Sequence, residues 1–505
     1  MLLAAVHSAI QQQAFHVPNL DYHALAPEII VTATLVVVLV ADLFLSDERK
    51  WLLSNVAGWG LLLALIFTVE LGARGHHASM VGGAYVVDDF ALVFKGLFLA
   101  VGYIVLLMST RYVEEGDYYE GEFYFLLLCS LLGMVVMASA RDLITIFVAL
   151  ETLSLPAYML AGWRKRDLRS NEAALKYYLL GVLASAVMLY GMSLVFGFAN
   201  STLLTDIGKA TQGSITHAPL LTVGIFFITV GFAFKVSAVP FHFWAPDTYE
   251  GAPTPVTAFL SVASKTGGFV ALLELIYIAF IGRADVWGPM FWALAALTMT
   301  VGNLIALRQT NIVRLLAYSS IAQAGYILVP FAVAGSNEKA LHSAFTASVT
   351  YLLIYAAMNL GAFAVVIAVA RKTRSGEIAS YGGLYEYAPG LTVLMTIFMF
   401  SLAGIPPLAG TWAKLFIFRA VLDSGTPSAV ALGVIAAVNA VIALFYYASI
   451  PRLMWMNPVP DGDRTPIRVP ASLQAALGLT VIIVVVIGVY PQLFAHLGDV
   501  ASLVR

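Results

Sequence analysis

The sequence predicts an all-α protein that crosses a membrane many times. Of its 505 residues, 60% are hydrophobic and only 11% are charged, and the mean hydropathy is +0.88. A soluble domain carries about 25% charged residues. Apolar runs of roughly 20 residues, each long enough to cross about 30 Å of hydrocarbon, recur from one end of the chain to the other. A β-barrel is excluded, because barrel strands are alternating segments of about 10 residues and these runs are continuous.

Fourteen apolar runs, joined by short loops, are predicted to be membrane-spanning helices. Three lie in residues 1–120, five in 121–281, five in 285–450 and one in 451–505. Residues 1–23 lack the basic start and long apolar centre of a signal peptide, so we expect no cleavage there. The predicted spans are 24–45, 51–73, 89–109, 121–139, 142–162, 171–198, 219–247, 254–281, 287–307, 313–334, 339–370, 391–423, 427–450 and 470–495.

The distribution of lysine and arginine predicts the orientation of the chain. Fifteen basic residues fall in or beside the odd-numbered loops and only five in the even-numbered loops. Because short cytoplasmic loops are enriched in basic residues, we expect the odd loops in the cytoplasm and both termini outside. The five basic residues of the even loops are Arg74, Arg141, Lys209, Arg283 and Lys339.

Two predicted spans, the seventh and the twelfth, contain prolines near their middle. Pro240 follows Lys235 in the seventh span, and Pro406 and Pro407 precede Lys414 in the twelfth. Proline removes a backbone donor and clashes with the preceding turn, so both helices are predicted to break. The carbonyls that lose their partners need a polar or hydrated cavity. One such kink is ordinary in a membrane helix, but two beside lysines favour a transport site.

The spacing of the two interrupted spans predicts an internal repeat. They are five spans apart, and a unit with an odd number of helices is inverted when it is repeated. Spans 4–8 and 9–13 are therefore predicted to be two inverted repeats, each with one broken helix, which is a pattern of transporter binding sites. Lys265 in the eighth span and Asn439 in the thirteenth lie at about the same depth, which extends the match.

Four ionisable residues lie too deep in predicted spans to reach the membrane surface: Glu151, Lys235, Lys265 and Lys414. Each costs about 2.5–3.5 kcal/mol at a helix centre, on the order of 10 kcal/mol in total. Structural pairing offsets part of this cost, but four such residues are hard to explain by structure alone. We therefore predict that they transfer protons.

Polar residues recur at helical spacing on three of the predicted spans. Each stripe alone is also typical of ordinary hydrogen bonding between membrane helices. As a set, and together with Asn439 in the thirteenth span, the stripes predict a proton relay that connects Lys265 to Lys414. The residues are Thr257, Ser261, Ser264 and Gly268 in the eighth span, Ser319, Gln323 and Tyr326 in the tenth, and His342, Thr346, Thr350, Tyr355 and Asn359 in the eleventh.

The remaining charges of the spans are interpreted as structural. Lys176 is expected to pair with Glu172, one turn earlier. Asp247 and Glu250 lie in a proline-rich turn, where they are expected to cap the following helix or to bind a ligand. The others lie towards helix ends or lack deep partners: Glu28, Asp42, Lys95, Glu274 and Arg419.

The sequence excludes several other kinds of site. The single Cys129 excludes an internal disulfide and a thiolate-held iron–sulfur cluster. The nine histidines are scattered, which makes paired haem ligation improbable. There is no P-loop, no dinucleotide fingerprint and no basic tract for nucleic acid. We expect no cofactor or metal in this chain, so energy for transport must come from elsewhere.

Four stretches of the sequence resemble the antiporter-like subunits of respiratory complex I, and most of all its N subunit. The resemblance runs from about residue 24 to about residue 490. The stretches are "ETLSLPAYML" (151–160), "FKVSAVPFHFWAPDTYEGAPTPV" (234–256), "RLLAYSSIAQAGY" (314–326) and "SLAGIPPLAGTWAKL" (401–415).

The resemblance implies fourteen helices with two inverted five-helix repeats, in agreement with the count above. It also implies functional roles for Glu151, Lys235, Lys265 and Lys414. A lysine at position 414 favours the N type over the M type, which has a glutamate there. The family often has a histidine where this chain has Gln323, so a relay at that step needs water or Tyr326 in its place.

By this resemblance the chain is a proton-translocating subunit of NADH:quinone oxidoreductase that carries out no redox chemistry itself. NADH, FMN, iron–sulfur clusters and quinone are then expected in other subunits, and the partners are other membrane-arm subunits. Two alternatives remain. One is a subunit of a multisubunit monovalent cation/proton antiporter, and the other is a non-pumping spacer of the membrane arm.

The mechanism that follows is a switch between Glu151 and Lys235. Burial favours the neutral form of a lysine, whereas a nearby carboxylate favours its charged form. At a distance of about 4 Å and an effective dielectric constant near 20, the attraction between the two charges is about 4 kcal/mol. Closing and opening this contact makes Lys235 hold and release a proton, which then passes to Lys265, to Lys414 and out.

Overall fold

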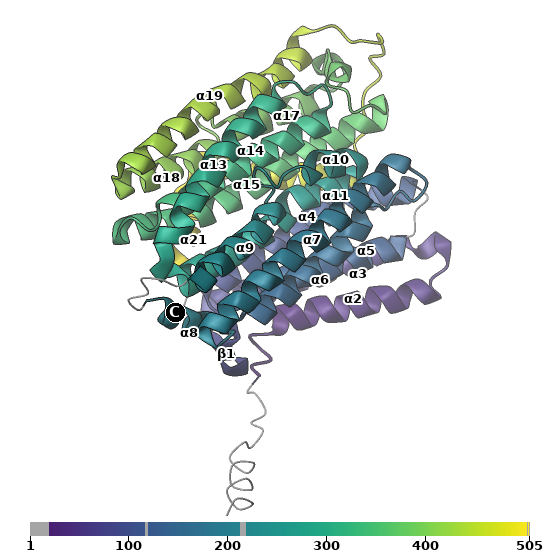
Figure 1. Cartoon of the computed structure of the whole chain (residues 1–505). Coiled ribbons are helices and arrows are strands. Elements are labelled where there is room, and N and C mark those ends of the chain that lie inside the picture. The colour runs from purple at the N-terminus through teal and green to yellow at the C-terminus, as the bar shows by residue number, and fades with distance from the viewer. Residues whose placement is uncertain (1–19, 117–119, 213–218, 502, 504–505) are drawn as a thin grey trace, which may run out of the picture.

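The computed structural model describes residues 20–116, 120–212, 219–501 and 503, and most of these residues are helical (Figure 1). The expectations for the first 19 residues and for the position of the N-terminus fall outside this part. The long helices are α2 (Ala26–Phe44), α3 (Trp51–Arg74), α4 (Asp89–Glu115), α5 (Glu120–Met137), α6 (Leu143–Ala161), α7 (Leu168–Ala199), α9 (Pro219–Lys235), α13 (Ala284–Ala306), α14 (Ile312–Val333), α15 (Glu338–Thr373), α17 (Pro389–Ala403), α18 (Ala409–Ser424), α19 (Pro427–Met456) and α20 (Ala471–Val489).

The eighth span is one long helix made of consecutive segments, and short elements join the spans. The segments are α11 (Thr254–Phe259), η3 (Leu260–Ser264), α12 (Lys265–Glu274) and η4 (Leu275–Ala279). The short elements are η1 (Asp47–Arg49), β1 (Ala78–Met80), η2 (Val81–Gly83), β2 (Tyr85–Val87), α8 (Leu204–Thr211), α10 (Trp244–Gly251), η5 (Ile281–Arg283), η6 (Ile378–Tyr381), α16 (Leu384–Tyr387) and α21 (Gln492–Val500).

The predicted fold class is confirmed. In the described part of the chain, eleven helical stretches are long and apolar enough to cross a membrane. Three shorter apolar helices, Gly121–Met137, Pro219–Lys235 and Pro389–Ala403, bring the total to the fourteen predicted spans. The sequence did not predict the two-stranded sheet, in which Ala78 of β1 faces Val87 of β2 in antiparallel register.

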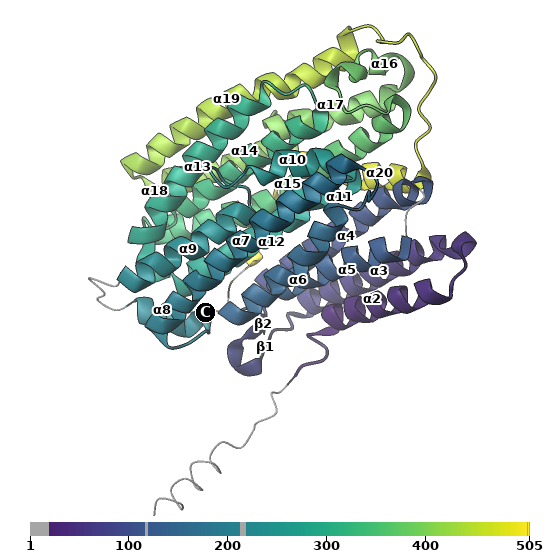
Figure 2. The ribbon, with the colours of Figure 1, turned by 45° about the vertical axis from the view of Figure 1, so that its right-hand side comes forward.

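The helices lie side by side in one bundle (Figures 1 and 2). In both views α2 and α3 form one edge, and α18 and α19 lie at the opposite edge. The eighth span and α15 are buried along their whole apolar length. Because other helices cover these two on all sides, they form the centre of the molecule.

The seventh span is interrupted after Lys235. Helix α9 ends at this residue, and α10 begins at Trp244 after eight irregular residues that include Pro240. The backbone of the interruption finds partners in other elements. The Val239 N–H donates to Oγ1 of Thr298 at 2.9 Å, and the Trp244 indole N–H donates to the Phe234 carbonyl at 2.9 Å. The break is therefore held in place by specific hydrogen bonds.

The twelfth span is interrupted in a similar way. Helix α17 ends at Ala403 and α18 begins at Ala409, with Pro406 and Pro407 between them. Gly404 closes α17 with a φ of +91°, a conformation that L side chains rarely adopt. The two breaks lie five spans apart, as the inverted repeats require. The division of the chain into repeats at 121–281 and 285–450 stays a prediction.

Replacing Gly404 with alanine is expected to destabilise the protein by about 1–3 kcal/mol, because a non-glycine residue at this φ is strained. The added Cβ also lies 2.9 Å from Cδ of Lys414. Thermal unfolding of the purified full-length chain measures this loss. Gly390→Ala is the control, since a Cβ there meets nothing within 4 Å. Equal melting temperatures for the two variants would contradict the expectation.

Candidate functional site

Lys235 lies at the last residue of α9, directly before the break, and its side chain is 3% exposed. Its Nζ donates a hydrogen bond to Oγ of Ser154 on α6 at 2.8 Å. The ring centre of Tyr177 lies 5.9 Å from the same nitrogen, within reach of a cation–π contact. A hydroxyl and an aromatic face therefore surround the amine in place of a carboxylate.

Glu151 lies on α6, one turn before Ser154, the residue that accepts from Lys235. Glu151 and Lys235 do not form an ion pair, because their nitrogen and oxygen atoms are not within 4.0 Å. Oε1 of Glu151 is buried without a hydrogen-bond partner among the described residues. The predicted contact between Glu151 and Lys235 is thus open in this structure.

Lys265 is the first residue of α12 and directly follows the π-helical turn η3. π-Turns within α-helices occur frequently at functional sites. Its Nζ donates to Oγ of Ser320 on α14 at 2.6 Å. Tyr355 of α15 donates to the same Oγ at 3.0 Å and lies 3.2 Å from the Ser261 carbonyl. Asn359 donates to Oγ of Ser261 at 2.7 Å, so three helices meet around this lysine.

Gly268 connects the surroundings of Lys235 and Lys265. It lies on α12, one turn after Lys265, and a Cβ built on it lies 3.1 Å from Cγ of Lys235. Glycine therefore allows the stem of Lys235 to lie against the helix that carries Lys265. The two lysines are neighbours across this contact, as a proton path between them requires.

Lys414 lies on α18, and its Nζ donates to the carbonyls of Leu402 and Ala403 at the end of α17. The helix break leaves these carbonyls without their usual intrahelical donors. The ring of Tyr326 lies 5.2 Å from the amine. The broken helix thus supplies the acceptors that hold this buried cation.

Gln323 connects Lys414 to a group of hydroxyls. Its Nε2 donates to the Leu402 carbonyl at 3.1 Å and to the Tyr447 hydroxyl at 3.0 Å. The Tyr351 hydroxyl donates to Oε1 of Gln323, and Oγ of Ser319 lies 2.5 Å from the Tyr447 hydroxyl. Since a glutamine side chain does not titrate, the tyrosine hydroxyls are the groups at this step that can exchange a proton.

The surroundings of Lys265 and Lys414 form two separate hydrogen-bonded groups. They come closest along α14, where Ser319 belongs to one and Ser320 to the other, and along α15, where Tyr351 and Tyr355 are one turn apart. No hydrogen bond between side chains of the described residues joins the two groups. The predicted relay is thus present as two parts with a gap between them.

Three residues of the predicted relay lie away from the lysines. His342 is exposed near the start of α15, and Thr346, one turn further, bonds Oδ1 of Asp499 at 3.2 Å. Asn439 exchanges hydrogen bonds with Asn303 and Thr300 on α13. The first turns of the eleventh span thus contact the C-terminal helix α21, whereas Tyr355 and Asn359 bond Ser320 and Ser261 close to Lys265.

A second group of buried charges was missed. Arg141 is 1% exposed, and its guanidinium contacts Oδ2 of Asp88 at 2.8 Å and Oε1 of Glu274 at 2.5 Å. Lys95 contacts Oε1 of Glu28 at 2.6 Å. The expectation that Glu274 lacks a deep partner is wrong. Arg141 lies in the loop between α5 and α6, as predicted, but it is buried there. These partners are 53 to 133 residues apart, and no local pattern in the sequence marks them.

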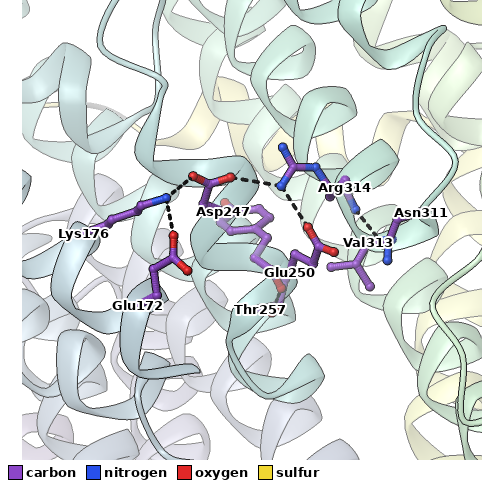
Figure 3. A network of polar contacts seen from close by, with 9 residues as sticks. Glu172, Lys176, Asp247, Glu250, Thr257, Asn311, Val313 and Arg314 are labelled. Atoms are coloured by element: carbon purple, nitrogen blue, oxygen red, sulfur yellow. Dashed lines mark hydrogen bonds and ion pairs between the residues drawn. The ribbon is translucent and has the colours of Figure 1, made fainter. Parts of the chain in front are cut away.

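The predicted pair of Lys176 and Glu172 is confirmed at 2.7 Å and belongs to a longer ion-pair network (Figure 3). Lys176 also contacts Asp247 at 2.7 Å, and Arg314 contacts Asp247 at 3.0 Å and Glu250 at 2.8 Å. The network joins α7, α10 and α14. Asp247 and Glu250 do not cap the next helix, because α11 begins without a side-chain cap.

Comparison with known proteins identifies relatives along the whole chain. The family model described as "NADH:quinone oxidoreductase/Mrp antiporter, TM" matches residues 140–439. The "NADH-quinone oxidoreductase subunit N" of Moorella thermoacetica is 39% identical over 476 residues, which cover 93% of this chain and 96% of the relative.

Two solved structures have the same fold. A chain of "Respiratory complex I from Thermus thermophilus with bound Aureothin" is 32% identical with a TM-score of 0.76, over 93% of this chain and 98% of that one. A chain of the Mrp complex from Dietzia sp. DQ12-45-1b has a TM-score of 0.82 but is 20% identical, over 95% of this chain and 97% of that one. At this identity the second likeness concerns the fold alone.

Proposed function

Because the chain belongs to the NADH:quinone oxidoreductase/Mrp antiporter transmembrane family, we propose that its buried lysines carry protons across the membrane. The chain is an antiporter-like membrane subunit of NADH:quinone oxidoreductase, of the N type. It is part of a translocase, in which electron transfer elsewhere in the complex drives proton transfer through Glu151, Lys235, Lys265 and Lys414.

The observation that carries this proposal is a contrast between two sets of buried cations. Lys95 and Arg141 each contact a carboxylate, as structural charges in a membrane do. Lys235, Lys265 and Lys414 form no ion pair with the described residues, and hydroxyls or carbonyls hold their amines instead. A buried amine without a counter-charge gives up its proton far more easily than a paired one.

The proposed path begins at Lys235. When Glu151 approaches, the ammonium form is stabilised, and when the carboxylate withdraws, the proton is released. The stem of Lys235 lies against Gly268, so the proton has a short way to Lys265, Ser320 and Tyr355. Between Tyr355 and Tyr351 on α15, where no hydrogen bond of the described side chains joins the two groups, a water molecule or a rotated tyrosine hydroxyl passes the proton on.

From Tyr351 the path continues through the hydroxyls around Gln323 to Lys414. The carbonyls at the end of α17 hold the charged amine there until the proton leaves. Water reaching the two helix breaks provides the entry and the exit.

Partners and location follow from the same assignment. We place the chain in a bacterial cytoplasmic membrane with both termini outside, beside other membrane-arm subunits of the complex. NADH, FMN, the iron–sulfur clusters and quinone belong to those other subunits. The cation/proton antiporter remains the alternative, but relatives of the N type match this chain at far higher identity than the Mrp subunit does.

Lys414→Met tests the exit of this path. We expect proton pumping during NADH oxidation to fall to that of membranes without this subunit, because methionine fills the space but carries no proton. Inverted membrane vesicles and a pH-sensitive dye measure the pumping. The control is Lys209→Met, which removes an exposed lysine whose one ion pair among the described residues is with Asp206. Coupled pumping that survives Lys414→Met in an assembled complex would refute the exit assignment.

A further inference from the structure

A large polar cavity lies away from the lysine path, on the side of the bundle where α4 and α15 end and α20 begins. Its volume is about 870 Å³, and it is lined by the last turns of α4 and α15, by the loop before α20 and by the first turn of α20. Nothing in the proton path uses this cavity. Its size is that of a small-molecule site.

Among the described residues, the lining of the cavity is strongly basic, with six basic residues and two acidic ones, Glu115 and Asp463. Since a cluster of like charges around one space is unfavourable without an anion, the composition indicates an anionic ligand. The six basic residues are Arg111, Arg164, Arg371, Lys372, Arg374 and Arg468.

The acidic residues of the lining do not neutralise this charge. Glu115 contacts Arg371 at 2.7 Å, and Asp463 contacts Lys372 at 3.4 Å. Arg111 and Arg164 have acidic neighbours outside the lining, at 2.5 and 3.5 Å. Within the part of the chain that the structure describes, Arg374 and Arg468 make neither an ion pair nor a side-chain hydrogen bond. Two guanidinium groups are therefore available to a ligand.

The first turn of α20 adds uncharged donors to the same cavity. This 19-residue helix begins after Pro470, which provides no side-chain cap, so its first backbone N–H groups lack side-chain partners. Ser472 in this turn also lines the cavity, and its Oγ is buried without a hydrogen-bond partner among the described residues. A helix N-terminus with a free hydroxyl and nearby arginines binds phosphate groups well.

We propose that this cavity binds the phosphate headgroup of an anionic membrane phospholipid. The cavity lies at the ends of membrane-spanning helices, where headgroups lie, and basic pockets between such helices bind anionic lipids. Apolar side chains of Met108, Ile367 and Leu473 line it beside the charges, as contact with the upper part of an acyl chain requires. The inference does not depend on proton transfer through the lysines.

Native mass spectrometry of the purified membrane complex tests this proposal. The complex is titrated with cardiolipin, with phosphatidylcholine and with inorganic phosphate. We expect wild-type protein to keep cardiolipin in a hundredfold excess of inorganic phosphate and to discriminate against phosphatidylcholine. Replacing both Arg374 and Arg468 with glutamine is expected to weaken cardiolipin binding by about thirtyfold. This is the effect of losing two basic residues beside an anionic headgroup.

A matched control removes the same charge elsewhere. Arg308→Gln with Arg452→Gln alters two exposed arginines outside the cavity, and it leaves cardiolipin binding at the wild-type level. Ser472→Ala is a milder change that is expected to lower the affinity for cardiolipin without altering the charge. It replaces the Arg374 and Arg468 double variant as the test if that variant fails to assemble. Equal binding of cardiolipin by both double variants overturns the proposal, because the two arginines of the cavity then do not hold the headgroup. Displacement of the lipid by inorganic phosphate overturns it as well, because the site then takes a free ion.

Discussion

Lys265→Met is expected to abolish proton pumping, while NADH oxidation in the presence of an uncoupler continues. Nζ of Lys265 donates to Oγ of Ser320, which also accepts from Tyr355. The stem of Lys235 lies against the helix that carries Lys265, so the proposed path passes through this amine. Methionine occupies a similar volume in the core but cannot accept or donate a proton. Pumping and oxidase activity are measured on the same inverted vesicles.

Two companion variants separate proton transfer from structure. Ser320→Ala removes the hydroxyl that accepts from Lys265 and is expected to slow pumping without abolishing it. Lys176→Met removes a lysine of the ion-pair network in Figure 3 and leaves the ratio of pumped protons to oxidised NADH unchanged. If Lys265→Met pumps normally, the path proposed through α12 does not exist.

Arg141→Met is expected to destabilise the subunit by about 3–5 kcal/mol, the cost of breaking a buried ion pair by removing one partner. The arginine is 1% exposed, and its loss leaves the carboxylates of Asp88 and Glu274 buried without their cation. Thermal unfolding of the purified full-length chain measures the change.

The matched control for this prediction is Arg74→Met. Arg74 pairs with Glu70 at 2.6 Å, but its side chain is 70% exposed. Surface pairs of this kind are worth about 0–1 kcal/mol, so the melting temperature stays close to that of the wild type. Combining Arg141→Met with Asp88→Asn and Glu274→Gln recovers part of the lost stability, because no buried charge then remains unpaired. An unchanged melting temperature for Arg141→Met alone would contradict the structural role of this cluster.

The fold was largely predictable because the membrane imposes a simple rule on the chain. Every span must satisfy its own backbone hydrogen bonds and must be apolar over about 20 residues. The fourteen spans could therefore be counted from the sequence, and the helix breaks could be located from Pro240, Pro406 and Pro407. The hairpin of β1 and β2 could not be predicted, because its three-residue strands are too short to show the alternating pattern of a strand.

The candidate site was predictable where a single residue is energetically unfavourable at its place in the sequence. A lysine in the middle of an apolar run is visible in the sequence, and Lys235, Lys265 and Lys414 are indeed buried and unpaired among the described residues. Relations between distant residues were not visible. Arg141 meets Glu274 across 133 positions, and the sequence shows neither the partner nor the depth of the arginine.

The polar stripes show a further limit of helical spacing. Spacing predicts which side chains share a face, but not which neighbour that face contacts along its length. The face of α15 meets α21 at Thr346 and the eighth span at Tyr355. The first turns of this face therefore contact the C-terminal helix, and a path that starts at His342 stays a prediction.

The measurement that tests the account most directly is the number of protons pumped per NADH oxidised by an assembled complex that carries Lys235→Ala. Lys235 lies at the helix break and contacts Ser154, with Glu151 one turn away. The account predicts that this number falls while uncoupled NADH oxidation persists, and that Glu151→Gln lowers it in the same direction. An unchanged number of protons per NADH in the Lys235→Ala complex would contradict the claim that buried amines carry the protons.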